Sequence, residues 1–459
     1  MADKKVSQET DLGLAGIDGT VEYRVIKSGG TYRQKYSDLF TYINGQLRIP
    51  TLQEVLDNNH SLTNGIVQIG TTAGGTSPGA GQISIGTSAL NVTSIGSVGI
   101  GVNAGVGSGG LRNVLIGNSA GGGLQGTGGN IVIGDNSGSG ANHASSIVLG
   151  TSTATSSSGT NSIFIGSSAG NYSGAGLAPA PINNIFLGPN AGGGNASTHN
   201  LGYNNIAIGQ DSLYNNDDNT RNNIIALGNK SGYSTGHALP GGTNSIYMGE
   251  ESGMNSGGNY MVALGYQAGR DTNSNNLIAI GNTAASATSG TNVVAIGAGA
   301  LAGGSTGDNL IAIGNNTANA GASDNTIAIG TAAMRSADAG GVVAIGTGSM
   351  EGFDGGPNAN CVAVGHDTGR SSDAIATGCV YVGTGAGRSN TARDVIALGT
   401  NAGLSNPTEG EFILASTHIR AFGSPLDASN YYSALTLSPN QTYIYIDTGD
   451  DNTLKVYRT

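Results

Sequence analysis

The side chains that most often carry chemistry are few and scattered in this sequence of 459 residues. The six histidines form no HExxH motif, and the only two cysteines, Cys361 and Cys379, form no paired metal motif. Glycine-rich strings such as GTGAGR at 383–388 have phosphate-loop spacing, but we expect no helix after them. The sequence therefore predicts no enzyme, no catalytic residue and no cofactor.

The strongest candidate for an ion site is the segment 214–223, in which Asp217 and Asp218 lie together. Repeat-type calcium sites need a nine-residue GGxGxD period, and that period is missing here. We therefore expect no bound metal.

Composition narrows the function classes further. Glycine supplies 81 residues, and the chain has only 18 basic residues with a net charge of −11. Binding to a nucleic acid backbone needs clustered Lys and Arg, so we expect no nucleic acid partner. No stretch is apolar enough for a membrane-spanning helix, and MADKKVSQETD lacks the apolar region of a signal peptide. We expect no insertion into a membrane.

A short motif that ends in glycine recurs about every 16 residues, as in NNIAIG at 204–209 and DNTIAIG at 324–330. Twenty such motif glycines run from Gly70 to Gly399, and ten of the nineteen spacings between them are 16 residues. Such a unit is too small to fold alone, so neighbouring units must bury one another. The repeat predicts an all-β fold, a parallel β-solenoid or β-roll of about twenty coils.

Each motif alternates like a β-strand. The residues three and one before the motif glycine are Ile, Val, Leu or Met in every unit, so they share one face of a strand. We expect this row, which includes Ile208, Ile280 and Ile313, to be buried. Asparagines before the strands, such as Asn204 and Asn309, should cap turns and form ladders between coils. Cys361 and Cys379 should stack in successive coils as packing residues.

The residue between these two positions faces the other way and is alanine in ten units. A monomer would expose this apolar row along the rod, so we expect it to face the axis of a parallel homotrimer. The candidate interface residues are Ala207, Ala226, Ala263, Ala279, Ala295, Ala312, Ala328, Ala344, Ala363 and Ala397.

The motifs NSIFIG at 161–166 and NNIAIG at 204–209, each followed by small residues, resemble the head repeats of trimeric autotransporter adhesins. They also resemble repeats in tail-fibre proteins of phages and prophages. The resemblance covers about residues 65–405 and implies three chains side by side. We see no signal peptide, coiled-coil stalk or membrane anchor, which favours the phage-like alternative.

The two ends of the chain depart from the repeat. Residues 1–60 predict two strands around Gly29 and Gly30 and a short helix at 51–60, and they resemble attachment regions of phage appendages. A plain solenoid cap is the alternative for this end. Residues 61–405 form the repeat region. Residues 406–459 contain four strand patterns, at 411–416, 433–438, 442–448 and 453–459, and should form a β cap.

Four consecutive long spacings, between Gly166 and Gly249, predict loops on one side of the rod. Tyrosine, histidine and charged side chains gather there, which is typical of glycan recognition on a rigid scaffold. These loops could instead only pack on neighbouring subunits. The candidate receptor-binding residues are Tyr172, His199, Tyr203, Tyr214, Asp217, Asp218, Arg221, Tyr233 and His237.

Together these patterns favour a homotrimeric fibre of a phage or phage-like particle. The N-terminus would bind other virion proteins, and the rod would contribute to attachment to a host-surface glycan or receptor. Such a protein is assembled in the host cytoplasm and is extracellular, on the virion, after release. The alternative is a cell-surface adhesin or glycan-binding solenoid of a bacterium.

Overall fold

The computed structural model describes most of the repeat region and short pieces of both ends. The described residues are 66–414, except 76–77, 92–94, 126–127, 172–181, 195–201, 215–221, 235–241, 320–321, 355–358 and 373–375, together with 22–27, 30–35, 420–422, 442–447 and 453–458.

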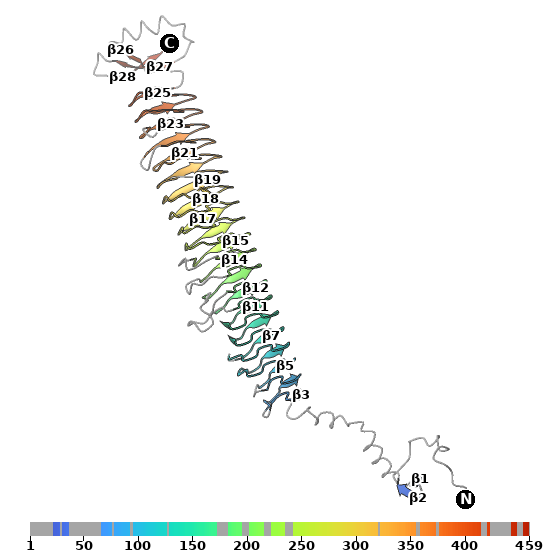
Figure 1. Cartoon of the computed structure of the whole chain (residues 1–459). Coiled ribbons are helices and arrows are strands. Elements are labelled where there is room, and N and C mark those ends of the chain that lie inside the picture. The colour runs from blue at the N-terminus through green and yellow to red at the C-terminus, as the bar shows by residue number, and fades with distance from the viewer. Residues whose placement is uncertain are drawn as a thin grey trace.

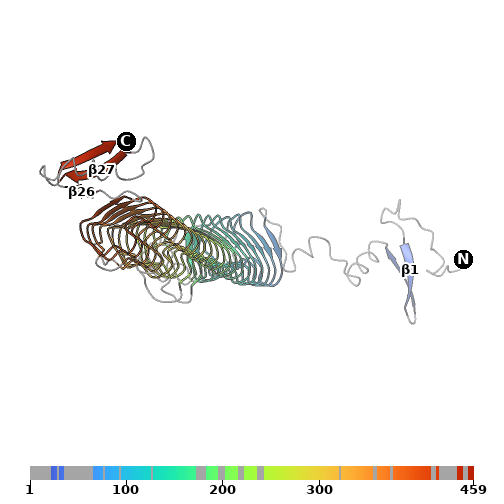
Figure 2. The same ribbon diagram turned by 90° about the horizontal axis from the view of Figure 1, so that it is seen from above.

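The repeat region is a parallel β-solenoid, as predicted, and its strands follow one another along a rod (Figure 1). Seen from above, each coil lies behind the next with little change of outline (Figure 2). Twenty-one short strands pair in parallel and in register, so the rod is about 100 Å long at about 4.8 Å per strand. They are β3 (Val67–Ile69), β4 (Ile83–Ile85), β5 (Val98–Ile100), β6 (Val114–Ile116), β7 (Ile131–Ile133), β9 (Ile147–Leu149), β11 (Ile163–Ile165), β12 (Ile185–Leu187), β13 (Ile206–Ile208), β14 (Ile225–Leu227), β15 (Ile246–Met248), β16 (Val262–Leu264), β17 (Leu277–Ile280), β18 (Val293–Ile296), β19 (Leu310–Ile313), β20 (Ile327–Ile329), β21 (Val343–Ile345), β22 (Val362–Val364), β23 (Val380–Val382), β24 (Ile396–Leu398) and β25 (Phe412–Leu414).

The motif glycine is needed because successive coils approach closely at this turn. Gly209 has a φ of 132°, a conformation that other residues rarely adopt. A Cβ atom on Gly209 would lie 2.4 Å from the carbonyl oxygen of Gly228 in the next coil. The recurring glycine therefore fixes both the turn and the spacing of the stack.

Asparagine side chains form ladders along the rod, as the sequence predicted. Asn204 Nδ2 donates to Asn223 Oδ1 at 3.0 Å, and Asn223 Nδ2 donates to Asn244 Oδ1 at 2.9 Å. A second ladder joins Asn276, Asn292, Asn309 and Asn325, with distances of 2.9–3.0 Å. These residues adopt positive φ, which asparagine tolerates better than most residues.

The prediction of which strand face is inside was wrong. All ten alanines predicted to line a contact between chains are buried within this single chain, with 0% exposure. The Ile and Val residues on either side of them form the outer face instead, and Ile208 is 39% exposed. The alanines therefore belong to the core and cannot reach a second chain.

The core is narrow, which explains this reversal. The inward strand residue faces a second inward position four residues after the motif glycine, and this second position is glycine wherever the strand residue is aromatic. Phe186 is opposite Gly192, where an added Cβ would lie 2.4 Å from the ring, whereas the next coil combines Ala207 with Leu213. The interior thus has little room at these two facing positions, and the bulky Ile and Val pairs lie outside.

A second parallel pair lies within the stack, β8 (Asn142–Ala144) with β10 (Ser158–Thr160). Near the N-terminus, the two predicted strands are present as β1 (Glu22–Lys27) and β2 (Gly30–Lys35), which form an antiparallel pair. Near the C-terminus, β27 (Thr442–Asp447) and β28 (Thr453–Arg458) were predicted, whereas β26 (Arg420–Phe422), parallel to β27, was not. The predicted strand 411–416 contains β25, which continues the solenoid stack.

The predicted helix at 51–60 and the strand pattern at 433–438 lie outside the described residues. Among the residues that are described, the elements are all strands, and no helix long and apolar enough to span a membrane occurs.

Candidate functional site

The structure describes three of the nine candidate receptor-binding residues, namely Tyr203, Tyr214 and Tyr233. Tyr214 and Tyr233 occupy equivalent positions in successive coils, five residues after the motif glycine. Tyr203 lies in a different part of its coil, three residues before β13, and is 40% exposed. The other candidates, Tyr172, His199, Asp217, Asp218, Arg221 and His237, lie outside the described residues.

Tyr214 and Tyr233 form a stacked pair. Their ring centroids are 5.8 Å apart and their planes differ by 14°. Backbone hydrogen bonds hold them in place, since the N–H of Ser234 donates to the Tyr214 carbonyl at 3.1 Å. Both rings are half-buried, so the pair offers a rigid aromatic surface where the long loops begin.

Polar side chains accompany this pair. Asp211 and Lys230 lie three residues before Tyr214 and Tyr233, and Asn190 Nδ2 donates to Asp211 Oδ1 at 2.8 Å. Burial, and then the nearby Tyr233 and Asp211, raise the pKa of Tyr214, so its hydroxyl stays protonated at neutral pH. Stacked rings near a carboxylate suit a sugar, which presents apolar ring faces and many hydroxyls.

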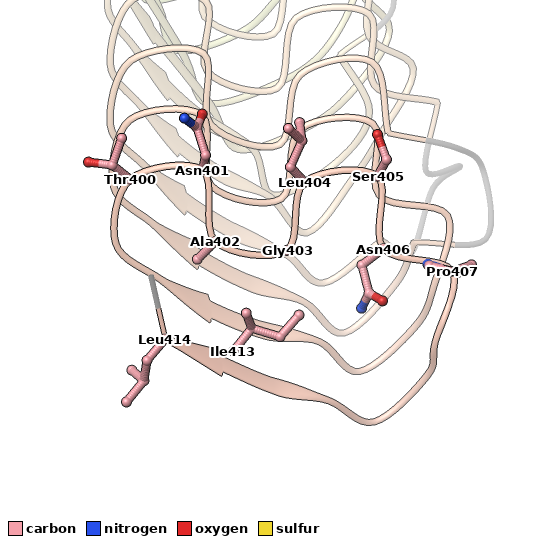
Figure 3. Close-up of a pocket in the computed structure, with 10 residues that line it drawn as sticks. All are labelled: Thr400, Asn401, Ala402, Gly403, Leu404, Ser405, Asn406, Pro407, Ile413 and Leu414. Carbon is pink, nitrogen blue, oxygen red and sulfur yellow. The ribbon is translucent and has the colours of Figure 1, made fainter. Parts of the chain in front are cut away.

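A hollow of about 420 Å³ lies at the last coil of the solenoid (Figure 3). Ala402 and Ile413 point into the coil, and Leu414 points away from it. The hollow is the end of the core, lined by turn residues and by this last strand. The lining residues are Thr400, Asn401, Ala402, Gly403, Leu404, Ser405, Asn406, Pro407, Ile413 and Leu414.

Charged side chains form ion pairs between coils on the rod surface. Glu351 contacts Arg335 on one side and Arg370, at 3.3 Å, on the other. Arg270 contacts Glu251 at 3.1 Å in the same manner. Pairs of this kind contribute little to stability individually, and here each carboxylate is already matched by arginine. We interpret them as contacts that align neighbouring coils.

Cys361 and Cys379 stack in successive coils, as predicted. Both are fully buried free thiols, and the backbone N–H of Cys379 lies 3.4 Å from Cys361 Sγ. Their own thiols contact backbone carbonyls, such as Cys361 Sγ with Ala376 O at 3.2 Å. The hydrogen bond with Cys379, together with burial, raises the pKa of Cys361. A satisfied, buried thiol of this kind is a packing residue.

His143 is a buried titratable group that the sequence did not single out. It lies in β8, contacts Ser157 Oγ at 3.1 Å, and its ring centroid is 5.4 Å from that of Phe164. Burial lowers its pKa from 6.5 to about 4, so the ring is neutral in the folded chain at neutral pH.

This burial predicts an acid-sensitive segment. Because the folded pKa is lower than the unfolded one, the unfolded chain takes up a proton first as the pH falls. Stability is therefore unaffected by His143 titration above about pH 6.5. As the pH falls to about 4, the free energy of unfolding decreases by roughly 3 kcal/mol. Hydrogen exchange of coils 131–187 at pH 7 and pH 4.5 should show this loss in the natural chain. His143→Gln should remove most of the difference, and an equal pH effect in both chains would contradict the assignment.

Comparison with known proteins gives no identification. No protein-family model matches the chain, and neither a curated protein nor a solved structure matches it.

Proposed function

We propose that three copies of this chain pack in parallel through the outer strand face and form a fibre. The observation that supports this most is the exposure of that face. Its Ile, Val, Leu and Met side chains run along the whole stack, and ten of them are 37–42% exposed. These ten are Ile69, Ile131, Ile133, Ile165, Ile208, Met248, Ile278, Ile345, Val382 and Ile396.

The size of the face is the physical reason for a partner. Apolar patches on soluble monomers rarely exceed a few hundred Å². Here two apolar residues per coil continue for about 100 Å, and most residues at the two borders are polar or glycine. A straight, in-register face of this kind fits another copy of itself, because the partner has the same length and the same spacing. The number three follows from the resemblance to trimeric adhesin heads.

In this proposal the trimer is a fibre of a phage or phage-like particle. Residues 1–60 attach it to other virion proteins, the solenoid projects outward, and the fibre contributes to attachment to a host-surface glycan. The resemblance of the repeats to tail-fibre proteins supports the particle, and the Tyr214–Tyr233 stack supports the glycan. A bacterial cell-surface adhesin with the same trimeric rod is the second candidate.

The assembly is tested by light scattering on the full chain. We expect three times the chain mass of 45.3 kDa, and a stable monomer would contradict the proposal. The particle is tested by electron microscopy of virions with this protein labelled. Label on a bacterial surface, in cells without particles, would favour the adhesin.

The glycan site is tested by replacing the stacked pair. Tyr214→Ala with Tyr233→Ala should weaken binding to host polysaccharide by about 10- to 100-fold, since each aromatic contact contributes roughly 0.5–1.5 kcal/mol. Trimer mass should not change, because neither ring lies on the outer strand face. Tyr203→Ala is the matched control, since it removes an exposed tyrosine elsewhere in the same coils. Loss of binding in the control alone would move the site to Tyr203.

A further inference from the structure

Two exposed tyrosines border the outer face in a single coil. Tyr260 lies two residues before β16 and is 60% exposed, and Tyr266 lies two residues after it and is 44% exposed. One therefore stands at each border of the apolar face, at the same height along the rod.

This combination occurs in one coil only. In the other coils the residue five before the motif glycine is Gly, Asn, Ser, Asp or Arg, never an aromatic residue. Tyr260 has a φ of 58°, the conformation that this turn position also adopts at Arg112, Asn244 and Asn276, and one that asparagine tolerates better than a bulky side chain does. It interrupts the asparagine ladder between Asn244 and Asn276, so it replaces a residue type that fits better locally.

A repeating apolar face does not define the register between two chains, and the pair Tyr260 and Tyr266 could supply it. The Ile and Val rows recur at every coil, so one chain could slide along another by about 4.8 Å and keep nearly the same apolar contacts. The face provides attraction between chains but does not define their register.

We infer that Tyr260 of one chain packs against Tyr266 of the next and fixes this register. The inference rests on the proposed trimer. In a parallel three-fold arrangement with the outer faces toward the axis, the border before the strand in each chain adjoins the border after the strand in its neighbour. Because both tyrosines belong to one coil, they meet only when all three chains are level, and they form three equivalent pairs.

The next coil allows a matched test, since the equivalent residues there are Asn276 and Asn282. The mismatched variant, Tyr260→Asn with Asn276→Tyr, moves one tyrosine by one coil. The matched variant adds Tyr266→Asn with Asn282→Tyr, so that both tyrosines move together. Composition is unchanged in both, and both carry the same loss of the Asn276 ladder bond.

We expect the mismatched trimer to dissociate at a lower guanidinium concentration than the natural one, and the matched trimer to recover most of the difference. Sliding cannot rescue the mismatch, because an equal offset at all three interfaces does not close a ring. Photo-oxidation of trimers with mixed isotope labels should give dityrosine between labelled and unlabelled chains, lost in the mismatched variant and regained in the matched one.

Equal dissociation of all three trimers, or absence of this cross-link in the natural trimer, would overturn the inference and leave the trimer intact. A monomeric natural chain would overturn the proposed assembly itself.

Discussion

Chains that carry aspartate at both Ile278 and Ile280 should be folded monomers. These side chains lie on the outer face of β17, where Ile278 is 39% exposed in the single chain. A carboxylate here is solvated in the monomer but would be buried beside like charges in the trimer, which costs several kcal/mol per chain. Light scattering should give the mass of one chain, and circular dichroism should match that of the natural protein.

Ala279→Asp places a charge on the inner face of the same strand. Ala279 is fully buried between two coils, so a charge there has no partner and should prevent the coil from forming. Loss of β structure is expected, rather than a folded monomer. If the double variant remained trimeric, or if Ala279→Asp folded normally, the assignment of the two faces would be wrong.

Phe186→Ala and Gly192→Leu should each destabilise the chain severely, and combining them should restore most of the stability, because the large side chain then lies on the opposite wall of the core. Phe186→Ala removes a fully buried ring that packs at a tilt against Phe164, with ring centroids 5.3 Å apart, and should cost about 3–5 kcal/mol. Gly192→Leu places a side chain where even a Cβ would lie 2.4 Å from the Phe186 ring, so that coil should not close.

The double variant has the combination that the next coil already has in Ala207 and Leu213. Leu213 tolerates the same backbone conformation, with a φ of 49° against 60° at Gly192. We expect the double variant to lose less than about 2 kcal/mol, as volume-conserving exchanges do. The loss of stability is measured by unfolding each variant in guanidinium, with protease resistance of the rod as the readout. Additive losses in the double variant would show that the two residues do not share one space.

The sequence predicts the stack well because each coil repeats the same local requirements. The motif glycine accepts a backbone conformation and a close approach that other residues cannot, so its positions mark the coils directly. Asparagine at a positive φ marks the turn before the strand in the same way. These signals recur in every coil, because each coil meets the next in the same way.

The face assignment failed because alternation shows which residues share a face, not which face is inside. The usual expectation that Ile is buried and Ala indifferent fails where two walls of a thin coil lie close together. The sequence did contain a signal. Phe186, Tyr247 and Tyr381 are each followed, six residues later, by glycine, as expected if the two positions face each other in a limited space.

The candidate site is predicted in part. Tyr214 and Tyr233 follow their motif glycines by the same five residues, so their stacking follows from the repeat, although their spacing along the chain is 19 residues. The inserted segments do not repeat in the sequence. Residues such as Asp217 and Arg221 therefore cannot be placed by the same argument.

The hydrogen bonds between coils, such as Gly281 N–H to the Leu264 carbonyl at 2.8 Å, run along the rod. Because the rows of bonds lie in series along the rod, a pulling force at the two ends would load every row equally, and a row that breaks would release one coil. A 16-residue coil, such as that from Gly265 to Gly281, adds about 4.8 Å to the rod but spans roughly 50–55 Å when drawn out. A fibre anchored at one end and bound at the other would therefore lengthen by roughly 45–50 Å for each coil that opens.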